Sequence, residues 1–438
     1  MRSNIHEAYI RILRSELIAA MGCTEPIAIA YAAALARKTL GKKPEHCLVD
    51  CSGNIVKNVM GVTVPNSGGM KGIDVAATLG LLGGDAGKGL EVLESVTPAQ
   101  IEEAKALLAQ GFCECRLVPN VENLYICIFV RAGRDSALVE IRNFHKNVTR
   151  IERNGEVLFE NDAACHEVSE EEARQADPDK ALLNIADILD FALSPEDTEV
   201  RAILEYQLSC NHAIAKEGLE HPYGAQVGRT LLPEGDPTPA NVRYFAKAWA
   251  AAGSDARMNG CAMPVVINSG SGNQGITVSL PVELYAKAHG ISHERMLQAL
   301  AISNLIAVHQ KKYVGSLSAY CGAVSAACGA GAGISYLLGE ELSREELYEQ
   351  ICGTIINTIV TVGGMVCDGA KSSCAAKIAC AVDCAVTAYE LARKGHVFHS
   401  GEGLVRKDAE HTIECIGRMA REGMRSTDTE ILQIMLGR

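Results

Sequence analysis

The sequence predicts a mainly α-helical protein, a helical body with an inserted small α+β domain that is built on an antiparallel sheet. Apolar residues recur at helical spacing near the start of the chain and again from about residue 181 to the end. Between these parts, short segments rich in β-branched residues alternate with turn residues, which is typical of strands. Aromatic residues make up only 5% of the 438 residues while glycine occurs 41 times, so the helices are expected to pack through small side chains.

Two helices are expected at the start of the chain. Residues 5–20 carry apolar side chains at helical spacing and are followed by Gly22. Pro26 suits the first turn of the next helix, over residues 27–41, which Gly41 ends. Short, glycine-interrupted segments follow as far as about residue 90.

A third expected helix opens the inserted domain. Thr97 can cap it and Gly111 ends it. Five strand-like segments follow between residues 113 and 160, and Asn154-Gly155 between the last two predicts a β-hairpin. The predicted parts are a helical body, first part, 1–90; an inserted α+β domain, 91–165; a charged linker, 166–180; and a helical body, second part, 181–438.

The charge of the chain excludes two classes of partner. Its 53 acidic and 41 basic side chains give a net charge of −12, whereas surfaces that bind nucleic acid or anionic membranes are basic. Residues 313–339 carry no charge but consist mostly of Gly, Ala and Ser, so we expect helices buried inside the protein rather than a membrane span. The first residues, MRSNIHEAYIRIL, lack the apolar core of a signal peptide, which predicts a cytoplasmic protein.

The 17 cysteines are the residues that most need an explanation. In a reducing compartment a disulfide framework is not expected at this length. Cysteines in the strand-like segments form no C-x-x-C pair, and no Cys/His array has the spacing of a zinc site. Most of the thiols are therefore predicted to be small apolar core residues.

Residues 270–275 fit the pattern G-x-G-x-x-G, but the segment ITVSLP follows them where a dinucleotide site needs a helix. An NAD site is therefore not predicted. The closely spaced backbone amides, together with nearby polar side chains, could instead hold a small carboxylate. An ordinary glycine loop is the other interpretation. The candidate substrate-binding side chains are Asn268, Ser269, Ser271 and Asn273.

Four cysteines have unusual surroundings. Cys321 lies in the uncharged stretch of small residues, while Cys367 and Cys374 flank a glycine turn and a helix start. Glycines next to a cysteine ligand allow the close backbone approach that iron–sulfur clusters need, although a shared core face explains the spacing equally well. Cys23 precedes Pro26 at a helix N-terminus, which is expected to lower the pKa of its thiol.

Three motifs together resemble one family. Met-Gly-Cys23-Thr-Glu-Pro, Asn268-Ser-Gly-Ser-Gly-Asn-Gln-Gly and Met-Val-Cys367-Asp-Gly-Ala-Lys-Ser-Ser-Cys374 are similar to the L-cysteine desulfidase family, a relative of the α-chain domain of iron–sulfur L-serine dehydratases. The resemblance runs nearly from end to end. It implies a lyase with a [4Fe-4S] cluster and no pyridoxal phosphate, which converts L-cysteine and water to pyruvate, ammonia and hydrogen sulfide.

The resemblance also implies roles for single residues. Cys321, Cys367 and Cys374 correspond to the cluster ligands, and Cys23 is a further ligand or an acid/base group. An open iron could act as Lewis acid on the leaving group. The candidates for the base that removes the Cα proton are Cys23, His309 and Lys371. The inserted domain resembles the small-molecule-sensing domain of serine dehydratases, which implies a regulatory or dimerising role and hence a homodimer.

Two departures bear on the substrate. The chain lacks the Ser-Ser-Ser-His-Thr-type motif of true serine dehydratases, and its end, ILQIMLGR, has no cysteine that could fold back onto a cluster. Both favour L-cysteine over L-serine. The alternatives are an L-serine dehydratase with the same cluster, a non-catalytic iron–sulfur or cysteine-sensing protein, and a cluster-free protein whose cysteines are inert.

Overall fold

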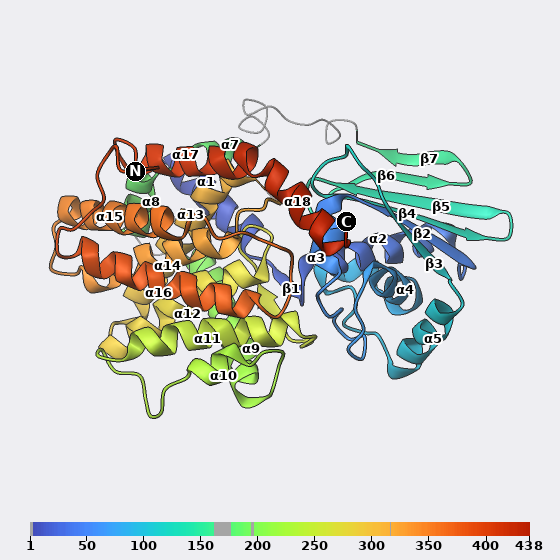
Figure 1. Ribbon diagram of the computed structural model, residues 1–438, viewed down its shortest axis with the longest axis horizontal. Coiled ribbons are helices and arrows are strands. Elements are labelled where there is room, and N and C mark those ends of the chain that lie inside the picture. The colour runs from blue at the N-terminus through green and yellow to red at the C-terminus, as the bar shows by residue number, and fades with distance from the viewer. Residues whose placement is uncertain (1–2, 162–176, 194–196, 316) are drawn as a thin grey trace.

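A computed structural model describes residues 3–161, 177–193, 197–315 and 317–438. It has two parts, a helical body and a sheet-containing domain, which lie side by side in Figure 1. The prediction of a mainly α-helical protein with a sheet-containing domain is confirmed. Of the predicted linker 166–180, residues 166–176 lie outside the described residues, and Asp177 caps the short helix that follows.

The helical body is formed by the first helix and by the second half of the chain, with a two-stranded antiparallel ribbon of β1 and β8. Its elements are α1 Ser3–Glu16, β1 Ala19–Met21, α7 Pro178–Ala181, α8 Ile185–Ala192, α9 Thr198–Glu220, α10 Val227–Leu231, α11 Val242–Met258, β8 Pro264–Val266, α12 Gly272–His289, α13 His293–Val314, α14 Gly322–Leu338, α15 Arg344–Val362, α16 Cys374–Ala392, α17 Ala409–Arg418, a π-helical turn Met419–Gly423 and α18 Arg425–Met435.

Close approach of α13 and α14 explains the uncharged stretch of small residues. A β-carbon added to Gly329 would lie 2.3 Å from the Ser303 carbonyl oxygen, and one added to Gly333 would lie 2.9 Å from the Ala299 carbonyl oxygen. Only glycine at these positions lets the two backbones pack this closely. Helix α14 is buried almost along its whole length, as expected for a core helix. No helix in the described ranges is long and apolar enough to cross a membrane.

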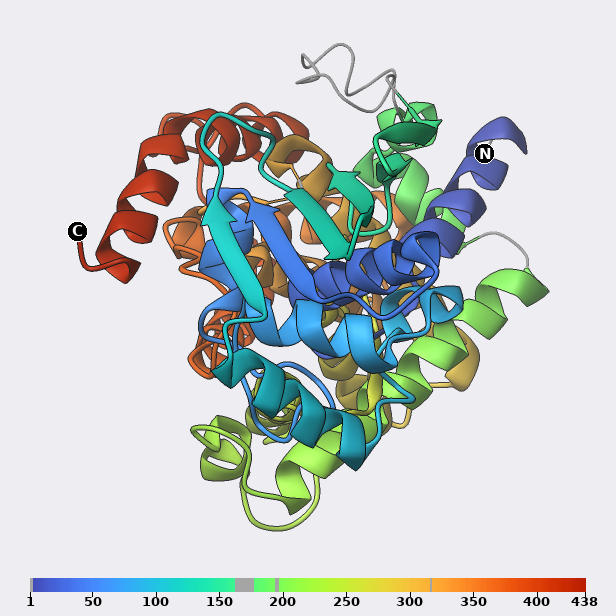
Figure 2. The ribbon, with the colours of Figure 1, turned by 90° about the vertical axis from the view of Figure 1, so that its right-hand side faces the viewer.

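The sheet-containing domain is built on a six-stranded sheet, which Figure 2 shows from its side of the molecule. The strand order is β3-β2-β4-β5-β6-β7, and α2 and α4 pack against the sheet. Its elements are α2 Thr24–Leu40, β2 His46–Cys51, α3 Gly53–Val59, α4 Ile73–Gly83, the 3₁₀ helix η1 Ala86–Glu91, α5 Pro98–Ala109, β3 Cys113–Leu117, β4 Tyr125–Ala132, β5 Asp135–Arg142, β6 Val148–Arg153 and β7 Glu156–Glu160.

The sheet differs from the prediction in two respects. It includes β2, which lies before the predicted domain boundary at residue 91, and β2 pairs in parallel with β3 while all other pairs are antiparallel. Parallel neighbours must be joined by a long crossover, and here α3, α4 and α5 lie between β2 and β3. This crossover places β2 well before β3 in the sequence, and therefore before the predicted boundary. The hairpin at Asn154-Gly155 is confirmed, with both residues at positive φ between β6 and β7.

Candidate active site

Four helices, α2, α12, α14 and α16, begin in one region of the protein. The Thr24 hydroxyl in the first turn of α2 donates to the Gly270 carbonyl oxygen before α12, at 2.9 Å. A β-carbon added to Gly322 at the start of α14 would lie 2.8 Å from the Gln274 amide carbon of α12. No described side chain caps any of the four helices. Their positive dipole ends therefore suit a negatively charged ligand.

Three of the four predicted cysteines are brought together at this site. The Cys321 N–H donates to the Met365 carbonyl oxygen at 3.0 Å, and the Cys367 N–H donates to the Ala319 carbonyl oxygen at 2.6 Å. These two bonds hold Cys321, just before α14, beside the loop that carries Cys367. Cys374 is the first residue of α16. All three are free thiols.

The chemistry of these thiols fits a metal cluster. Burial and then the neighbouring Cys367 raise the pKa of Cys321 to about 12. Burial is also the main cause that raises the pKa of Cys374, and Cys367 adds to it. Adjacent thiols that raise each other's pKa ionise together only where positive charge compensates them, as a bound metal does. The position of Cys321, Cys367 and Cys374 beside these helix ends therefore matches the cluster that the resemblance implies.

Cys23, the residue before α2, lies near Cys374, one of the three thiols. It packs with Cys374 around Met258, and its thiol donates to Glu25 Oε2 at 2.9 Å. The prediction that the helix N-terminus lowers the pKa of Cys23 is wrong. Burial and the Glu25 carboxylate raise this pKa well above its usual range, and Arg257 opposes them. Cys23 is therefore a neutral thiol that is hydrogen-bonded to a carboxylate.

Glu25 is surrounded by polar groups from separate segments of the sheet-containing domain. The Asn58 amide donates to Glu25 Oε1 at 3.1 Å, and His145 Nε2 lies 3.9 Å from the same oxygen. Burial acts to raise the pKa of Glu25, but His145 and the Cys23 thiol outweigh it and lower this pKa to about 2. Glu25 is thus an ionised carboxylate next to Thr24, whose hydroxyl bonds to the Gly270 carbonyl oxygen of the helical body.

The predicted substrate loop has a different structure from the expected one. Helix α12 begins at Gly272, inside the glycine motif, so the expectation that no helix follows the motif is wrong. Asn268 is fully buried, and its amide donates to the carbonyl and side-chain oxygens of Asn304, at 3.2 and 3.0 Å. The Ser269 hydroxyl donates to Asn268 Oδ1. Asn268 and Ser269 therefore hold the loop in shape.

The other two side chains of this loop have less defined partners. Ser271 is the residue before α12, and its hydroxyl does not cap that helix. Asn273 Oδ1 is buried and accepts no hydrogen bond from any described residue. Of the four predicted substrate-binding residues, Ser271 and Asn273 are the two that the structure leaves available to a ligand.

The two remaining candidate bases lie in different places. Lys371 is in the loop between Cys367 and Cys374, where its ammonium pairs with Asp368. His309 is fully buried on α13, and its Nε2 lies 2.6 Å from Glu410 Oε2 of α17. No described contact joins His309 to the cysteines. Of the two, only Lys371 borders the site.

Among the residues of the site that the sequence analysis missed are three basic side chains. His145 comes from the turn between β5 and β6, Arg257 from the end of α11, and Lys311 from the end of α13. Burial lowers the pKa of Lys311 to about 8, against the opposing effect of Cys367 and Cys321. Each is a single residue outside any motif, so no spacing pattern marked them.

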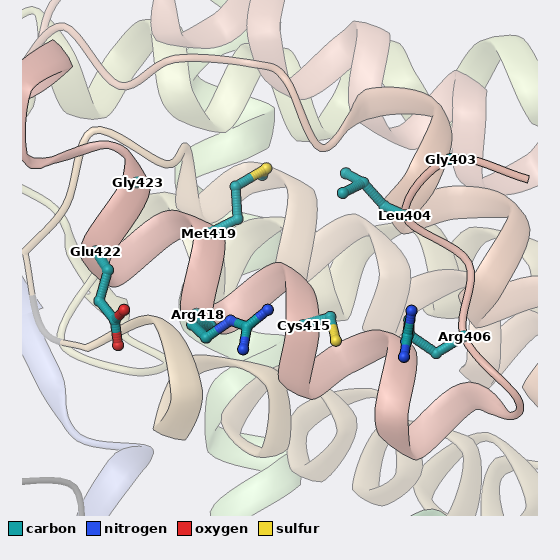
Figure 3. Close-up of a pocket in the computed structure, with 8 residues that line it drawn as sticks. All are labelled: Gly403, Leu404, Arg406, Cys415, Arg418, Met419, Glu422 and Gly423. Carbon is teal, nitrogen blue, oxygen red and sulfur yellow. The ribbon is translucent and has the colours of Figure 1, made fainter. Parts of the chain in front are cut away.

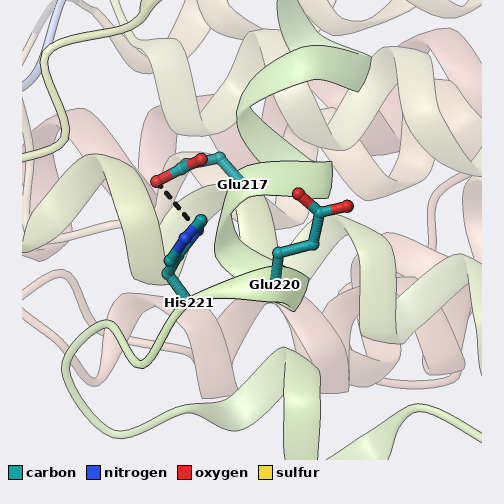
Figure 4. Close-up of side chains that lie close together, drawn as sticks. All are labelled: Glu217, Glu220 and His221. Carbon is teal, nitrogen blue, oxygen red and sulfur yellow. Dashed lines mark ion pairs between the residues drawn. The ribbon is translucent and has the colours of Figure 1, made fainter.

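Two other features do not include Cys23, Cys321, Cys367 or Cys374. Figure 3 shows a cavity of about 620 Å³ beside α17. Figure 4 shows Glu217, Glu220 and His221 at the end of α9, where the imidazole pairs with Glu217 at 3.1 Å. Neither feature contains a predicted site residue. The cavity is lined by Gly403, Leu404, Arg406, Cys415, Arg418, Met419, Glu422 and Gly423.

Comparison with known proteins agrees with this arrangement. The chain is 51% identical over 432 residues to a UPF0597 protein of Lachnoclostridium phytofermentans, covering 99% of this chain and 100% of the relative. It is 46% identical over 435 residues to a UPF0597 protein of Treponema denticola, covering 98% of each chain.

Residues 87–433 match the family described as serine dehydratase alpha chain. This span includes Cys321, Cys367 and Cys374 and most of the helical body. A dehydratase is a lyase, so the match indicates a lyase-type enzyme. The predicted relationship to the α-chain domain of serine dehydratases is confirmed. The chain belongs to the serine dehydratase alpha chain family.

Proposed function

We propose that this protein is an iron–sulfur-dependent lyase that eliminates the β-substituent of a small amino acid. The proposed substrate is L-cysteine, which with one water gives pyruvate, ammonia and hydrogen sulfide. The main support is the group of three free thiols, Cys321, Cys367 and Cys374, beside four uncapped helix N-termini. Thiolates at such a position suit a cluster because N–H groups and helix dipoles stabilise its negative charge.

In this proposal Cys321, Cys367 and Cys374 hold a [4Fe-4S] cluster. With three protein thiolates on four irons, such a cluster supplies a Lewis acid for the departing sulfide or hydroxide. Lys311 and Lys377 contribute positive charge beside these thiolates, since both interact electrostatically with Cys321. No further thiol ligand from the chain's C-terminal segment is required.

Cys23 and Glu25 are the groups best suited to handle a proton. They share one hydrogen bond of 2.9 Å, and both side chains are buried. β-Elimination needs a group that takes the Cα proton. In this proposal the Cys23 thiol passes its proton to Glu25 and the resulting thiolate takes the Cα proton, after which the proton on Glu25 passes to the departing hydrosulfide and the pair returns to its starting state. Burial keeps bulk water from the reacting carbon until the enamine product leaves, after which tautomerisation and hydrolysis give pyruvate and ammonia.

The second candidate is an L-serine dehydratase that uses the same site. The family description favours it, whereas the missing Ser-Ser-Ser-His-Thr-type motif favours cysteine. A non-catalytic iron–sulfur protein is the third candidate. The three differ in the product formed from each amino acid.

The test is iron and sulfide analysis of protein purified without oxygen, for the wild type, Cys367→Ala and Cys115→Ala. Cys115 is exposed on β3 in the sheet-containing domain, so its variant is the matched control. We expect the wild type and Cys115→Ala to contain iron and sulfide, and Cys367→Ala to lose most of both. A full cluster content in Cys367→Ala would overturn the ligand assignment.

Substrate choice is tested on the same anaerobic protein. We expect sulfide release from L-cysteine to exceed pyruvate formation from L-serine. The reverse order would identify a serine dehydratase. A protein that contains the cluster but converts neither amino acid would be a non-catalytic iron–sulfur protein.

A further inference from the structure

Arg257 is a buried arginine without a counter-charge. Its side chain is at the end of α11 and the residue is only 2% exposed. Its Nε is completely buried and donates no hydrogen bond, and its guanidinium forms no ion pair with any residue of the described part of the chain. A buried charge that has no partner strongly destabilises a folded protein. Such a group is therefore expected to meet its partner in a bound ligand.

The guanidinium lies against the first turn of α12. A β-carbon added to Gly272, the first residue of this helix, would lie 2.3 Å from Arg257 Nε and 2.8 Å from Cζ. The absent side chain at Gly272 thus makes room for the guanidinium beside the uncapped N–H groups of α12. Arg257 also acts on the thiols of Cys23 and Cys374, since its charge lowers the pKa of both. The Arg257 cation and the N-terminus of α12 therefore lie together, next to the proposed reacting groups.

Two buried acceptors without donors belong to residues that contact the same site. Asn58 Oδ1 and Gln274 Oε1 receive no hydrogen bond from any described residue. The orientation of Asn58 follows from its amide nitrogen, which donates to the Glu25 carboxylate at 3.1 Å. The Gln274 side chain lies against Gly322, next to Cys321. Unpaired acceptors of this kind match a ligand that carries N–H donors.

We propose that Arg257 and the first turn of α12 bind the α-carboxylate of a free amino acid, while Asn58 and Gln274 accept hydrogen bonds from its α-ammonium group. The ligand class is thus the zwitterion of a small α-amino acid, with both groups unblocked. A carboxylate provides only acceptors and an ammonium only donors, which is the complement of the unpaired groups in the protein. This inference rests on the proposed function only for the location of the site, because it concerns the binding of the amino acid and not the elimination of its β-substituent.

L-Alanine is the probe, because it is a small free amino acid that has no β-leaving group and is not consumed. Its affinity for the anaerobically purified full chain is measured by calorimetry, for the wild type, Arg257→Gln and Arg257→Lys. We expect the affinity to fall by about thirtyfold or more in Arg257→Gln and by less in Arg257→Lys. Lysine keeps the positive charge but cannot form the bidentate hydrogen bonds of a guanidinium to a carboxylate. Wild-type protein should bind L-alaninamide, which lacks the carboxylate, far more weakly than L-alanine.

Arg243→Gln is the matched control. Arg243 lies on the same helix, but its guanidinium pairs with Asp383 on α16. This variant should keep the wild-type affinity for L-alanine. Iron content and the thermal midpoint of each ligand-free variant are measured as well, and we expect Arg257→Gln to be as stable as the wild type or more stable, because it removes a buried unpaired charge.

Several outcomes would overturn the proposal: no binding of L-alanine to the wild type, equal binding of L-alanine and L-alaninamide, or an unchanged affinity in Arg257→Gln. The proposal would also be contradicted if Arg257→Gln and Arg257→Lys lost L-alanine binding only together with a loss of iron and a lower thermal midpoint. Failure of the proposed function looks different. Arg257-dependent binding of L-alanine without elimination from any amino acid would refute the reaction and leave the carboxylate site in place.

Discussion

The two parts of this protein differ in how their buried charged side chains are paired. In the sheet-containing domain, Arg142 forms two hydrogen bonds to Glu140, at 2.7 and 2.8 Å, and pairs with Glu122. It also stacks on the Tyr125 ring at 5.0 Å. At the helix N-termini, Arg257 has no such partners among the described residues. The sheet satisfies its own charges, whereas the helical site leaves one for a ligand.

The cysteines of the two parts show the same contrast. Cys47 and Cys113 lie directly opposite each other on parallel strands. Burial, followed by Glu140, raises the pKa of Cys127 to about 12, so the neighbours of the sheet thiols are other thiols and carboxylates. The charges of Lys377 and Arg257, in contrast, act to lower the pKa of Cys374. The surroundings of a cysteine therefore indicate its role better than the number of cysteines does.

The largest effect is expected where the two parts meet, at Lys57. This lysine is 1% exposed on α3, pairs with Asp428 of α18 and donates to the Cys367 carbonyl oxygen at 3.3 Å. Lys57→Met leaves the Asp428 carboxylate without its partner, so we expect urea unfolding to show a loss of about 3–5 kcal/mol in the free energy of unfolding.

The matched control for Lys57 is Lys105→Met, which removes an exposed pair with Glu102. We expect a loss of less than about 1 kcal/mol there. The double variant Lys57→Met/Asp428→Leu should recover part of the lost stability, since it removes both charges. Equal effects of Lys57→Met and Lys105→Met would mean that the buried pair does not join the two parts.

The second prediction contrasts the two arginines. Arg142→Met removes two hydrogen bonds and the counter-charge from the buried Glu140 carboxylate, so we expect a loss of about 2–4 kcal/mol in the free energy of unfolding. Arg257→Met should cause no loss. Arg116→Met, which removes an exposed pair with Asp50 on a neighbouring strand, should cost less than about 1 kcal/mol. A larger loss in Arg257→Met than in Arg142→Met would reverse the comparison.

Local features could be predicted from the sequence because neighbouring residues determine them. Thr97 forms a capping box with Gln100 at the start of α5, as its position before the helix indicates. Gly41 ends α2 with φ of 76°, and the Asn154-Gly155 turn forms the predicted hairpin. The grouping of Cys321, Cys367 and Cys374 was also expected, but only their family resemblance distinguished them from core cysteines.

Features set by tertiary packing could not be predicted in this way. The β-branched residues after Gly275 favour a strand, and Pro281 argues against a helix, yet α12 continues through both. The helix is buried on nearly all sides, so packing outweighs these local preferences. Likewise Arg257 and His145 come from elements far apart in the sequence, and only the folded chain brings them to one site.

The smallest predicted effect concerns a second buried charge on α11, Asp255. It is fully buried, and burial raises its pKa to about 6 even though its carboxylate accepts a hydrogen bond from the Gly228 N–H at 2.8 Å. A carboxyl whose pKa is higher in the folded state than in the unfolded state stabilises the protein when protonated. This contribution is complete below about pH 4 and is lost as the pH rises through about 6.

Asp255→Asn resembles the protonated acid at every pH, so it should remove this dependence. We expect the variant to be more stable than the wild type by about 2–3 kcal/mol at about pH 7.5, by about half as much at about pH 5, and nearly equal to it at about pH 3.5, measured by urea unfolding. Asp383→Asn should show the opposite sign, because Arg243 holds the pKa of Asp383 below its usual range and its charged form stabilises the protein at neutral pH. If Asp255→Asn were less stable than the wild type at neutral pH, burial of the Asp255 carboxylate would not destabilise the protein, and the unfavourable buried charge on α11 would be that of Arg257.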